Sequence, residues 1–381
     1  MSDNPIFSSC RSARAGFGFS RAGFGSVCVG SESARAGFAG RRSGAVLAAA
    51  VLVFFVLIVS SCSCGGGRTD DGGQPVAFPF PEAPLMVQQQ GPVAVAEYLC
   101  GHFWNDYLDT SRIFPDSDTL FLGVTRAALK DAVRNYAYLA DVVSSDPEVF
   151  LSNAATFRST LENLLGRAAS LSGDGTCPEL FRCLADDLSL YFYDPNSPYR
   201  NEELYAFIAS VLAESPLVDE TLRGRYRFEQ GLCSLNPPGS VASDFAFTDR
   251  DGKVSTMHSV NADYTIMFFT NPGCNACSQI IDMLMSFRTS SGLGLSDLIV
   301  SGKVAVLNIY IDSDIEAWMD YSASYPADWH NGYDPYGILR DNSLYAIRAI
   351  PSLYLLDSGK RVLFKDAVPE KVIAYLQKRV D

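Results

Sequence analysis

The sequence predicts an all-α helical domain over residues 92–235 and an α/β domain over residues 236–381, with a mixed central sheet flanked by helices. In the first segment, apolar residues recur at the i, i+3, i+4 and i+7 spacing of amphipathic helices and show no strand-like alternation. In the second segment, short apolar runs of strand length alternate with helical patterns. The breaker cluster LNPPGS at residues 235–240 separates the two patterns and marks the boundary.

The composition excludes a disordered chain and argues against a nucleic-acid-binding protein. The 381 residues are 48% apolar and 19% charged, so the chain can bury a sizeable core and wholesale disorder is excluded. Residues 1–61 hold six Arg and two acidic residues, whereas residues 62–381 hold 24 basic and 41 acidic residues. This acidic body argues against nucleic-acid binding, which needs a basic surface. With three His in the whole chain, we expect no metal site.

The sequence predicts that residues 1–61 are a low-complexity leader followed by a signal and that they belong to neither folded domain. The leader repeats a short Arg-Ala-Gly-Phe unit and has no folded-domain pattern. Ala45 to Val59 is an unbroken apolar run of 15 residues that follows Arg41 and Arg42. A basic segment before a run shorter than the ~20 residues of a membrane-spanning helix is typical of a secretory signal.

The signal ends in Val59-Ser60-Ser61-Cys62, which resembles a bacterial lipobox. The resemblance implies cleavage before Cys62, lipidation of this residue, and a lipid-anchored protein of the bacterial cell envelope. The alternative is a signal anchor that happens to be followed by Cys. Residues 62–91, rich in Gly and Pro, then read as a flexible tether between the lipid and the folded body.

The helical domain contains many aromatic residues and four cysteines. Aromatic residues on helices usually form core, and a peptide-binding groove is the alternative. The four cysteines allow three pairings in an exported protein, or they are buried free thiols. They are Cys100, Cys177, Cys183 and Cys233. Helices are predicted at about residues 93–108, 124–143, 147–171, 178–192, 201–214 and 219–232.

In the α/β domain, a buried strand at residues 264–270 leads through Asn271-Pro272-Gly273 into Cys274-Asn275-Ala276-Cys277 and a helix. A cysteine that caps a helix N-terminus is stabilised as the nucleophilic thiolate by the unpaired N–H groups there. The second cysteine, three residues on, faces the same side and can resolve a mixed disulfide. Structural zinc is the alternative, but it needs a second ligand pair, and none lies nearby in the sequence.

Further strands are predicted on both sides of this motif. A hairpin joins residues 245–248 to 254–257, and residues 304–311 form another buried strand. Ile350-Pro351-Ser352 stands ~75 residues after the CxxC motif and precedes strands at 353–356 and 361–364. Helices are predicted at 315–325 and from Pro369 to the end.

Residues 240–381 resemble the TlpA/ResA-like branch of exported thioredoxin-fold proteins. The shared features are the Asp251-Gly252-Lys253 turn, the Phe-Phe-x-x-Pro-Gly-Cys approach, the CxxC motif and the Ile-Pro-Ser motif. The upstream domain resembles the uncharacterised helical domain of certain bacterial lipoproteins, which carries Phe-Trp at 103–104 and SPYRNEELY at 197–205.

The resemblance implies an envelope thiol-disulfide oxidoreductase without a cofactor. Cys274 would attack, Cys277 would resolve, and Ile350-Pro351, with a cis peptide bond, would pair with the backbone of an extended substrate. The implied partners are protein thiols and disulfides and a further redox protein. Three positions depart from the family, since Gly273 replaces a common Trp, and Phe268 and Ile280 stand where a buried acid is found.

Two other functions and one loop complete the sequence predictions. A peroxidase needs Pro and Thr where Met267 and Asn271 precede Cys274. A binding or scaffold lipoprotein with a weakly active or inactive thioredoxin domain is the second alternative function.

Residues 328–334 are predicted to form a loop near the active site, for which there are two alternatives. Either Trp329 and His330 are exposed and contact substrate, or Trp329 packs on the core.

Overall fold

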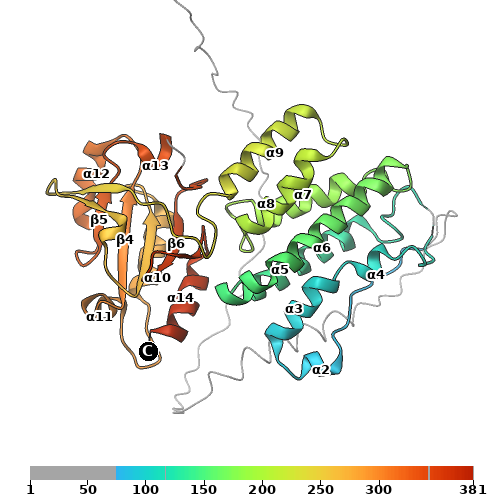
Figure 1. Ribbon diagram of the computed structural model, residues 1–381, viewed down its shortest axis with the longest axis horizontal. Coiled ribbons are helices and arrows are strands. Elements are labelled where there is room, and N and C mark those ends of the chain that lie inside the picture. Colours follow the sequence, from blue (N-terminus) through green and yellow to red (C-terminus); the bar gives the residue numbers. More distant parts are fainter. Residues whose placement is uncertain (1–73, 116, 342–343, 381) are drawn as a thin grey trace, which may run out of the picture. The chain divides into compact units, whose positions relative to one another are not determined.

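Residues 74–235, here the helical part, fold into helices whose apolar faces meet in one core (Figure 1). The computed structural model describes residues 74–115, 117–341 and 344–380. Predicted helices are confirmed at nearly the expected bounds, except that residues 93–108 form two helices that break at Phe103 and Trp104. The helices are α2 (Leu85–Gln88), α3 (Pro92–His102), α4 (Asn105–Leu108), α5 (Arg126–Val143), α6 (Pro147–Gly173), α7 (Leu180–Phe192), α8 (Glu202–Glu214) and α9 (Glu220–Cys233).

Capping side chains set the starts of the longer helices. Thr125 accepts a hydrogen bond from the backbone N–H of Ala128 at the start of α5, and Asn201 does the same for Leu204 at the start of α8. Asp146 caps α6, and Asp219 caps α9. Each side chain satisfies an N–H group that has no partner within its helix, which is why these helices begin where they do.

The tether ends earlier than residue 91, where the sequence prediction placed its end. Phe78 is 6% exposed, and its ring lies 5.0 Å from that of Tyr107 and 5.8 Å from that of Trp104. Within the described part of the predicted tether, residues 74–91, Phe78 therefore packs on the helical core. One fully buried aromatic ring contributes roughly 1.5–3 kcal/mol, which favours the ordered position of the residues next to Phe78.

Residues 236–380, here the α/β part, contain a seven-stranded mixed sheet in the order β2-β1-β5-β4-β3-β6-β7. Strands β3, β4 and β5 are mutually parallel, and β6 runs antiparallel to β3. The strands are β1 (Ala246–Asp249), β2 (Val254–Thr256), β3 (Tyr264–Phe269), β4 (Val304–Tyr310), β5 (His330–Tyr333), β6 (Ser352–Asp357) and β7 (Val362–Phe364). The helices are α10 (Asn275–Met285), α11 (Leu295–Val300), α12 (Ile315–Tyr321), α13 (Ile338–Asp341) and α14 (Pro369–Arg379).

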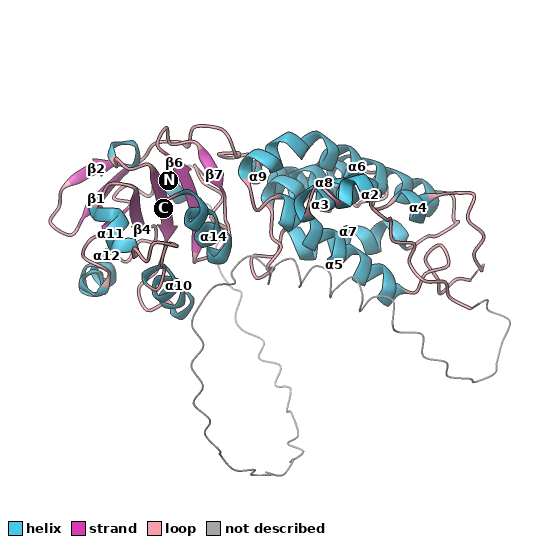
Figure 2. Cartoon of the chain, turned by 90° about the horizontal axis from the view of Figure 1, so that it is seen from below, coloured by secondary structure: helices cyan, strands magenta, loops and turns pink. Residues whose placement is uncertain are grey.

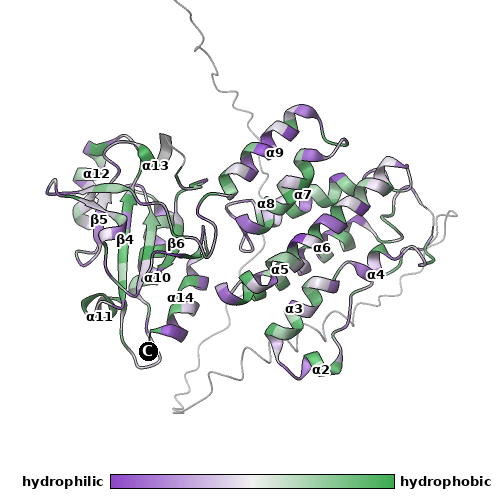
Figure 3. Ribbon diagram, in the orientation of Figure 1, coloured by the Kyte–Doolittle hydropathy of each residue, from purple (hydrophilic) through white to green (hydrophobic). Residues whose placement is uncertain are grey.

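Side chains of β3 alternate between the two faces of the sheet, as a strand requires. Ile266 and Phe268 join a core with residues of α10, α11 and α14, whereas Met267 and Phe269 join a core with the first hairpin. Figure 2 shows α10 and α14 as helices beside the strands, and Figure 3 shows β4 mostly in the colour of hydrophobic residues. Burial on both faces explains why β3 and β4 are nearly continuous apolar runs in the sequence.

Strand β5 lies within residues 328–334, for which the sequence predicts a loop, so this prediction is wrong. His330-Asn331-Gly332-Tyr333 lacks the apolar alternation of a strand. This segment forms a strand because it pairs in parallel with β4 and antiparallel with β1.

None of the helices that the structure describes is both long and apolar enough to cross a membrane.

Candidate active site

The CxxC motif lies at the start of α10, directly after β3. Gly273 has φ of +69°, a left-handed conformation that favours glycine, so the Trp of similar proteins would be strained here. Cys274 is the N-cap of α10, and its Sγ accepts a hydrogen bond from the backbone N–H of Cys277 at 3.1 Å. This geometry confirms the predicted place of Cys274 at the helix N-terminus.

Cys274 and Cys277 form a disulfide bond, and they differ in exposure. Cys274 is half-buried, whereas Cys277 is 2% exposed and packs among core residues that include Phe268 and Leu353. After reduction, the N–H groups and dipole at the start of α10 stabilise a thiolate at Cys274 by roughly 0.3–1 kcal/mol or more. One sulfur is therefore accessible and the other is shielded, as attack by Cys274 and resolution by Cys277 require.

Ile350 and Pro351 lie at the same end of the sheet as the two cysteines. In the antiparallel pair of β3 and β6, Ser352 stands opposite Phe269, which places Pro351 beside the turn that leads to Cys274. The Ile350–Pro351 peptide bond is cis, as the resemblance implied. Among the described residues, the backbone N–H and carbonyl of Ile350 have no hydrogen-bond partner. This backbone is therefore available to pair with an extended peptide.

Polar side chains that were not predicted as site residues lie at this end of the sheet. The hydroxyl of Thr270 donates to Asn308 Oδ1 at 2.6 Å, and Asn308 Nδ2 donates to Asn331 Oδ1 at 2.9 Å. Asn271 Nδ2 donates to Asp312 Oδ2 at 2.8 Å and ties the turn before Cys274 to the end of β4. The one visible signal was Asn308, a lone polar residue within the apolar run of residues 304–311.

Trp329 does not contact substrate from an exposed loop, and this alternative is wrong. Its side chain is buried in the core that also contains Cys277. His330 begins β5 and pairs with Leu307, two residues before the level of Ile309 and Phe269 at the active-site end. His330 itself is exposed; partial desolvation by its surroundings lowers its pKa, and the positive charges of Lys253 and Lys360 lower it further. The other alternative, in which Trp329 packs on the core, is confirmed.

The four cysteines of the helical part are free and buried. Burial raises the pKa of each thiol, that of Cys233 to about 12. Thiols with a raised pKa are poor nucleophiles near neutral pH. Reactivity toward disulfides is therefore expected at the CxxC motif rather than at Cys100, Cys177, Cys183 and Cys233.

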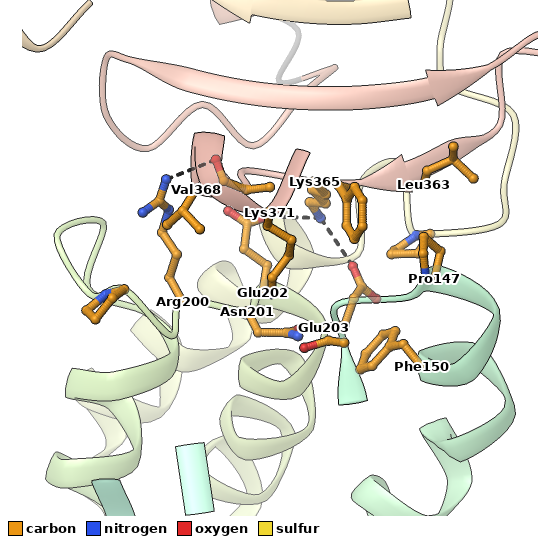
Figure 4. A pocket seen from close by; sticks show the side chains of 15 residues that line it. Pro147, Phe150, Arg200, Asn201, Glu202, Glu203, Leu363, Lys365, Val368 and Lys371 are labelled. Atoms are coloured by element: carbon orange, nitrogen blue, oxygen red, sulfur yellow. Dashed lines mark hydrogen bonds and ion pairs between the residues drawn. The ribbon is translucent and has the colours of Figure 1, made fainter. Parts of the chain in front are cut away.

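A cluster of six buried or half-buried charges joins the helical part to the α/β part. We call it the interface ion cluster, and Figure 4 shows Arg200, Glu202, Glu203 and Lys365 around the small pocket, about 40 Å³, that they line. Lys365 is 2% exposed and lies 3.0 Å from Glu202 Oε2 and 3.6 Å from Glu203 Oε1. The members of the interface ion cluster are Arg200, Glu202 and Glu203 from the helical part, and Arg348, Lys365 and Asp366 from the α/β part.

The cluster makes stability depend on pH through Glu203. Burial and the charge of Glu202 raise the pKa of Glu203 to about 7, against the lowering effect of Lys365. A carboxyl group with a raised folded pKa binds its proton more tightly when folded, so folding loses stability as pH rises from about 4.5 to about 7. Glu203→Gln should remove this loss, which amounts to roughly 3 kcal/mol between pH 5 and pH 8.

Urea unfolding at several pH values measures this effect. Glu214→Gln, at the exposed end of the same helix, is the matched control and should keep the pH profile of the parent protein. A parallel profile for Glu203→Gln and the parent would show that Glu203 ionises normally in the folded protein.

The helical part matches a known family. Residues 58–236 match the family model for a domain of unknown function, DUF5106. This match covers the helices α2 to α9 and ends where the sequence pattern changes. No curated protein matches the chain.

Solved structures resemble both parts. A thioredoxin-like protein from Bacteroides caccae is 29% identical, with a TM-score of 0.62 over 79% of this chain and 98% of that chain. The C-terminal domain of an uncharacterized protein from Bacteroides fragilis is 37% identical, with a TM-score of 0.35 over 37% of this chain and 97% of that chain. The thioredoxin domain of a thiol-disulfide oxidoreductase from Bacteroides vulgatus is 18% identical, with a TM-score of 0.33 over 38% of this chain and 99% of that chain.

The B. caccae structure covers 79% of this chain, and its TM-score indicates that the two proteins share a fold over this length. The sequence prediction of an α/β part with a mixed central sheet is confirmed. Residues 58–236 of the chain are similar to the DUF5106 family, and its α/β part has a thioredoxin-like fold.

Proposed function

We propose that the protein is a thiol-disulfide oxidoreductase of the bacterial cell envelope. The observation that carries this proposal is the pairing of a half-buried Cys274, which caps α10, with a shielded Cys277 at the strand end where Ile350 offers free backbone groups. A structural disulfide does not need one accessible sulfur beside an unpaired peptide backbone.

In the reductive direction, the Cys274 thiolate attacks one sulfur of a substrate disulfide and forms a mixed disulfide, and the other substrate sulfur leaves as a thiolate. Cys277 then loses its proton and attacks Cys274 Sγ. The Cys274–Cys277 disulfide forms, and the second substrate sulfur leaves as a thiolate. Two electrons pass to the substrate, whose thiolates take up protons from solvent. The oxidative direction is the reverse, and a redox partner in the envelope regenerates the starting state.

The reduction potential of the Cys274–Cys277 pair tests the proposal and assigns the direction. The protein is equilibrated with glutathione buffers, and the free thiols are counted by alkylation and mass spectrometry. A potential near −270 mV, that of thioredoxin, indicates a reductase, and one near −120 mV, that of the strong periplasmic oxidant DsbA, indicates an oxidase. Slow alkylation of reduced Cys274 at pH 6, no faster than a model thiol, would instead favour a scaffold lipoprotein.

We also propose that Cys62 carries the lipid anchor. Cys62 and the signal before it lie outside the described residues, so this proposal depends on the lipobox-like Val59-Ser60-Ser61-Cys62 alone. Mass spectrometry of the mature protein should find Cys62 as the first residue, modified on its thiol and its amine. Cys62→Ser should release the protein from membranes or leave it unprocessed. An uncleaved chain, or a mature chain that begins at another residue, would contradict the proposal.

A further inference from the structure

The interface ion cluster holds the segment that precedes Pro351. Arg348, three residues before Pro351, donates from Nε to Glu202 Oε1 at 2.6 Å. Its Nη1 donates to the carbonyl oxygen of Tyr193, and its guanidinium lies 4.3 Å from the centroid of the Tyr193 ring. Three contacts with two residues of the helical part therefore fix the guanidinium plane, because a planar fork with several acceptors fits in only one orientation.

The cluster also holds the residue that follows Pro351. Arg348 Nη2 donates to Asp366 Oδ2 at 2.6 Å, and the hydroxyl of Ser352 donates to Asp366 Oδ1 at 3.0 Å. Arg200 of the helical part donates from Nε to the backbone carbonyl of Asp366 at 2.8 Å. Arg348 and Ser352 thus flank Pro351 on both sides, and each is tied through Asp366 to the helical part.

Burial makes this arrangement specific. The side chains of Glu202 and Arg348 are 1% and 8% exposed, so water cannot replace a lost partner. Other ion pairs between the two parts lack this link to the site. Lys371 of α14 pairs with Asp141 of α5 at 2.5 Å, whereas the hydrogen-bond partners of Arg348 among the described residues are Glu202, Tyr193 and Asp366.

We propose that Glu202 of the DUF5106 domain is a positioning residue for substrate binding, which acts through Arg348 on the backbone of Ile350 and Pro351. The helical part thereby sets where an extended polypeptide substrate pairs beside Cys274. This inference rests on the proposed thiol-disulfide oxidoreductase function. It assigns the SPYRNEELY motif, which contains Glu202, to the substrate site rather than to the helical core alone.

The test compares two disulfide substrates of the full-length protein. Insulin offers extended polypeptide to the Ile350 backbone, whereas the small aromatic disulfide DTNB offers none. Glu202→Gln removes the charge at constant shape, and the ratio of the KM for insulin to the KM for DTNB should rise about tenfold, as expected for a displaced binding element. The kcat for insulin should change much less than its KM, because Cys274 and Cys277 keep their places.

Asp141→Asn is the matched control, since it breaks an ion pair between the same two parts and should leave the ratio unchanged. Arg348→Lys keeps the positive charge but loses the planar guanidinium group that contacts several acceptors at once. It should therefore raise the ratio of the two KM values, as Glu202→Gln does. This variant replaces Glu202→Gln in the test if Glu202→Gln does not fold. An equal ratio in Glu202→Gln, Arg348→Lys and Asp141→Asn would overturn the inference. A parent protein that exchanges with neither insulin nor DTNB would overturn the proposed function itself.

Discussion

Cys277→Ala is expected to accumulate covalent adducts with envelope proteins that a reducing agent releases, whereas Cys274→Ala accumulates few or none. Cys274 is the accessible sulfur at the start of α10, and Cys277 is the shielded one. Resolution of a mixed disulfide needs a second thiolate, because water does not cleave the bond on this timescale. Both single variants should lose turnover by about a thousandfold or more, but only Cys277→Ala should trap substrate.

Non-reducing gels and mass spectrometry of the adducts measure this result. The matched control replaces the buried cysteines of the helical part, Cys100, Cys177, Cys183 and Cys233, by Ala in each variant. Since burial raises the pKa of these thiols, the trapping pattern should survive their removal. Equal trapping by Cys274→Ala and Cys277→Ala would show that either thiol attacks. If Cys277→Ala forms no adducts, the result would favour a binding or scaffold lipoprotein over an oxidoreductase.

Lys365→Met should destabilise the folded protein by about 3–5 kcal/mol, the usual cost of a buried charge that loses its partner. Lys365 lies between Glu202 and Glu203 and donates to the backbone carbonyl of Cys233 at 2.6 Å. Met fills a similar volume but leaves two carboxylates without this cation. The loss should be smaller at pH 5 than at pH 8, because Glu203, whose pKa is about 7, is then protonated.

Lys371→Met provides the comparison for this variant. Lys371 is 12% exposed and its partner Asp141 is 28% exposed, so its replacement should cost less than that of Lys365, which is 2% exposed between two carboxylates. Urea unfolding of both variants at pH 5 and pH 8 gives the two differences. The double variant Glu202→Gln with Lys365→Met should lose less than the sum of the single changes, because the two residues share one interaction. Equal losses in Lys365→Met and Lys371→Met would show that burial adds nothing to the interface ion cluster.

Much of the site was readable in the sequence because its determinants are local. A strand, a turn and a CxxC motif within a few residues place Cys274 at a helix N-terminus whatever surrounds them, and the cap to Cys277 spans three residues. Helix starts were equally predictable, since Thr125, Asn201 and Asp219 each bond to an N–H group two or three residues ahead. Local rules of this kind hold wherever the bonded groups are neighbours in the chain.

Tertiary structure alone decided β5 and the interface ion cluster. Residues 330–333 form a strand because β1 and β4 supply backbone partners on both sides. The close pairing with β1 requires glycine at position 332, since a Cβ there would lie 2.6 Å from the Phe247 ring. Glu202 and Arg348 are 146 residues apart, and each looks like an ordinary surface charge in the sequence. The cost of burying a charge is met only when a distant partner arrives with it, so no spacing in the sequence reveals the pair. The sequence by itself thus determined where the two cysteines lie, at the start of a helix that follows a buried strand, and the tertiary structure decided what holds the backbone beside them.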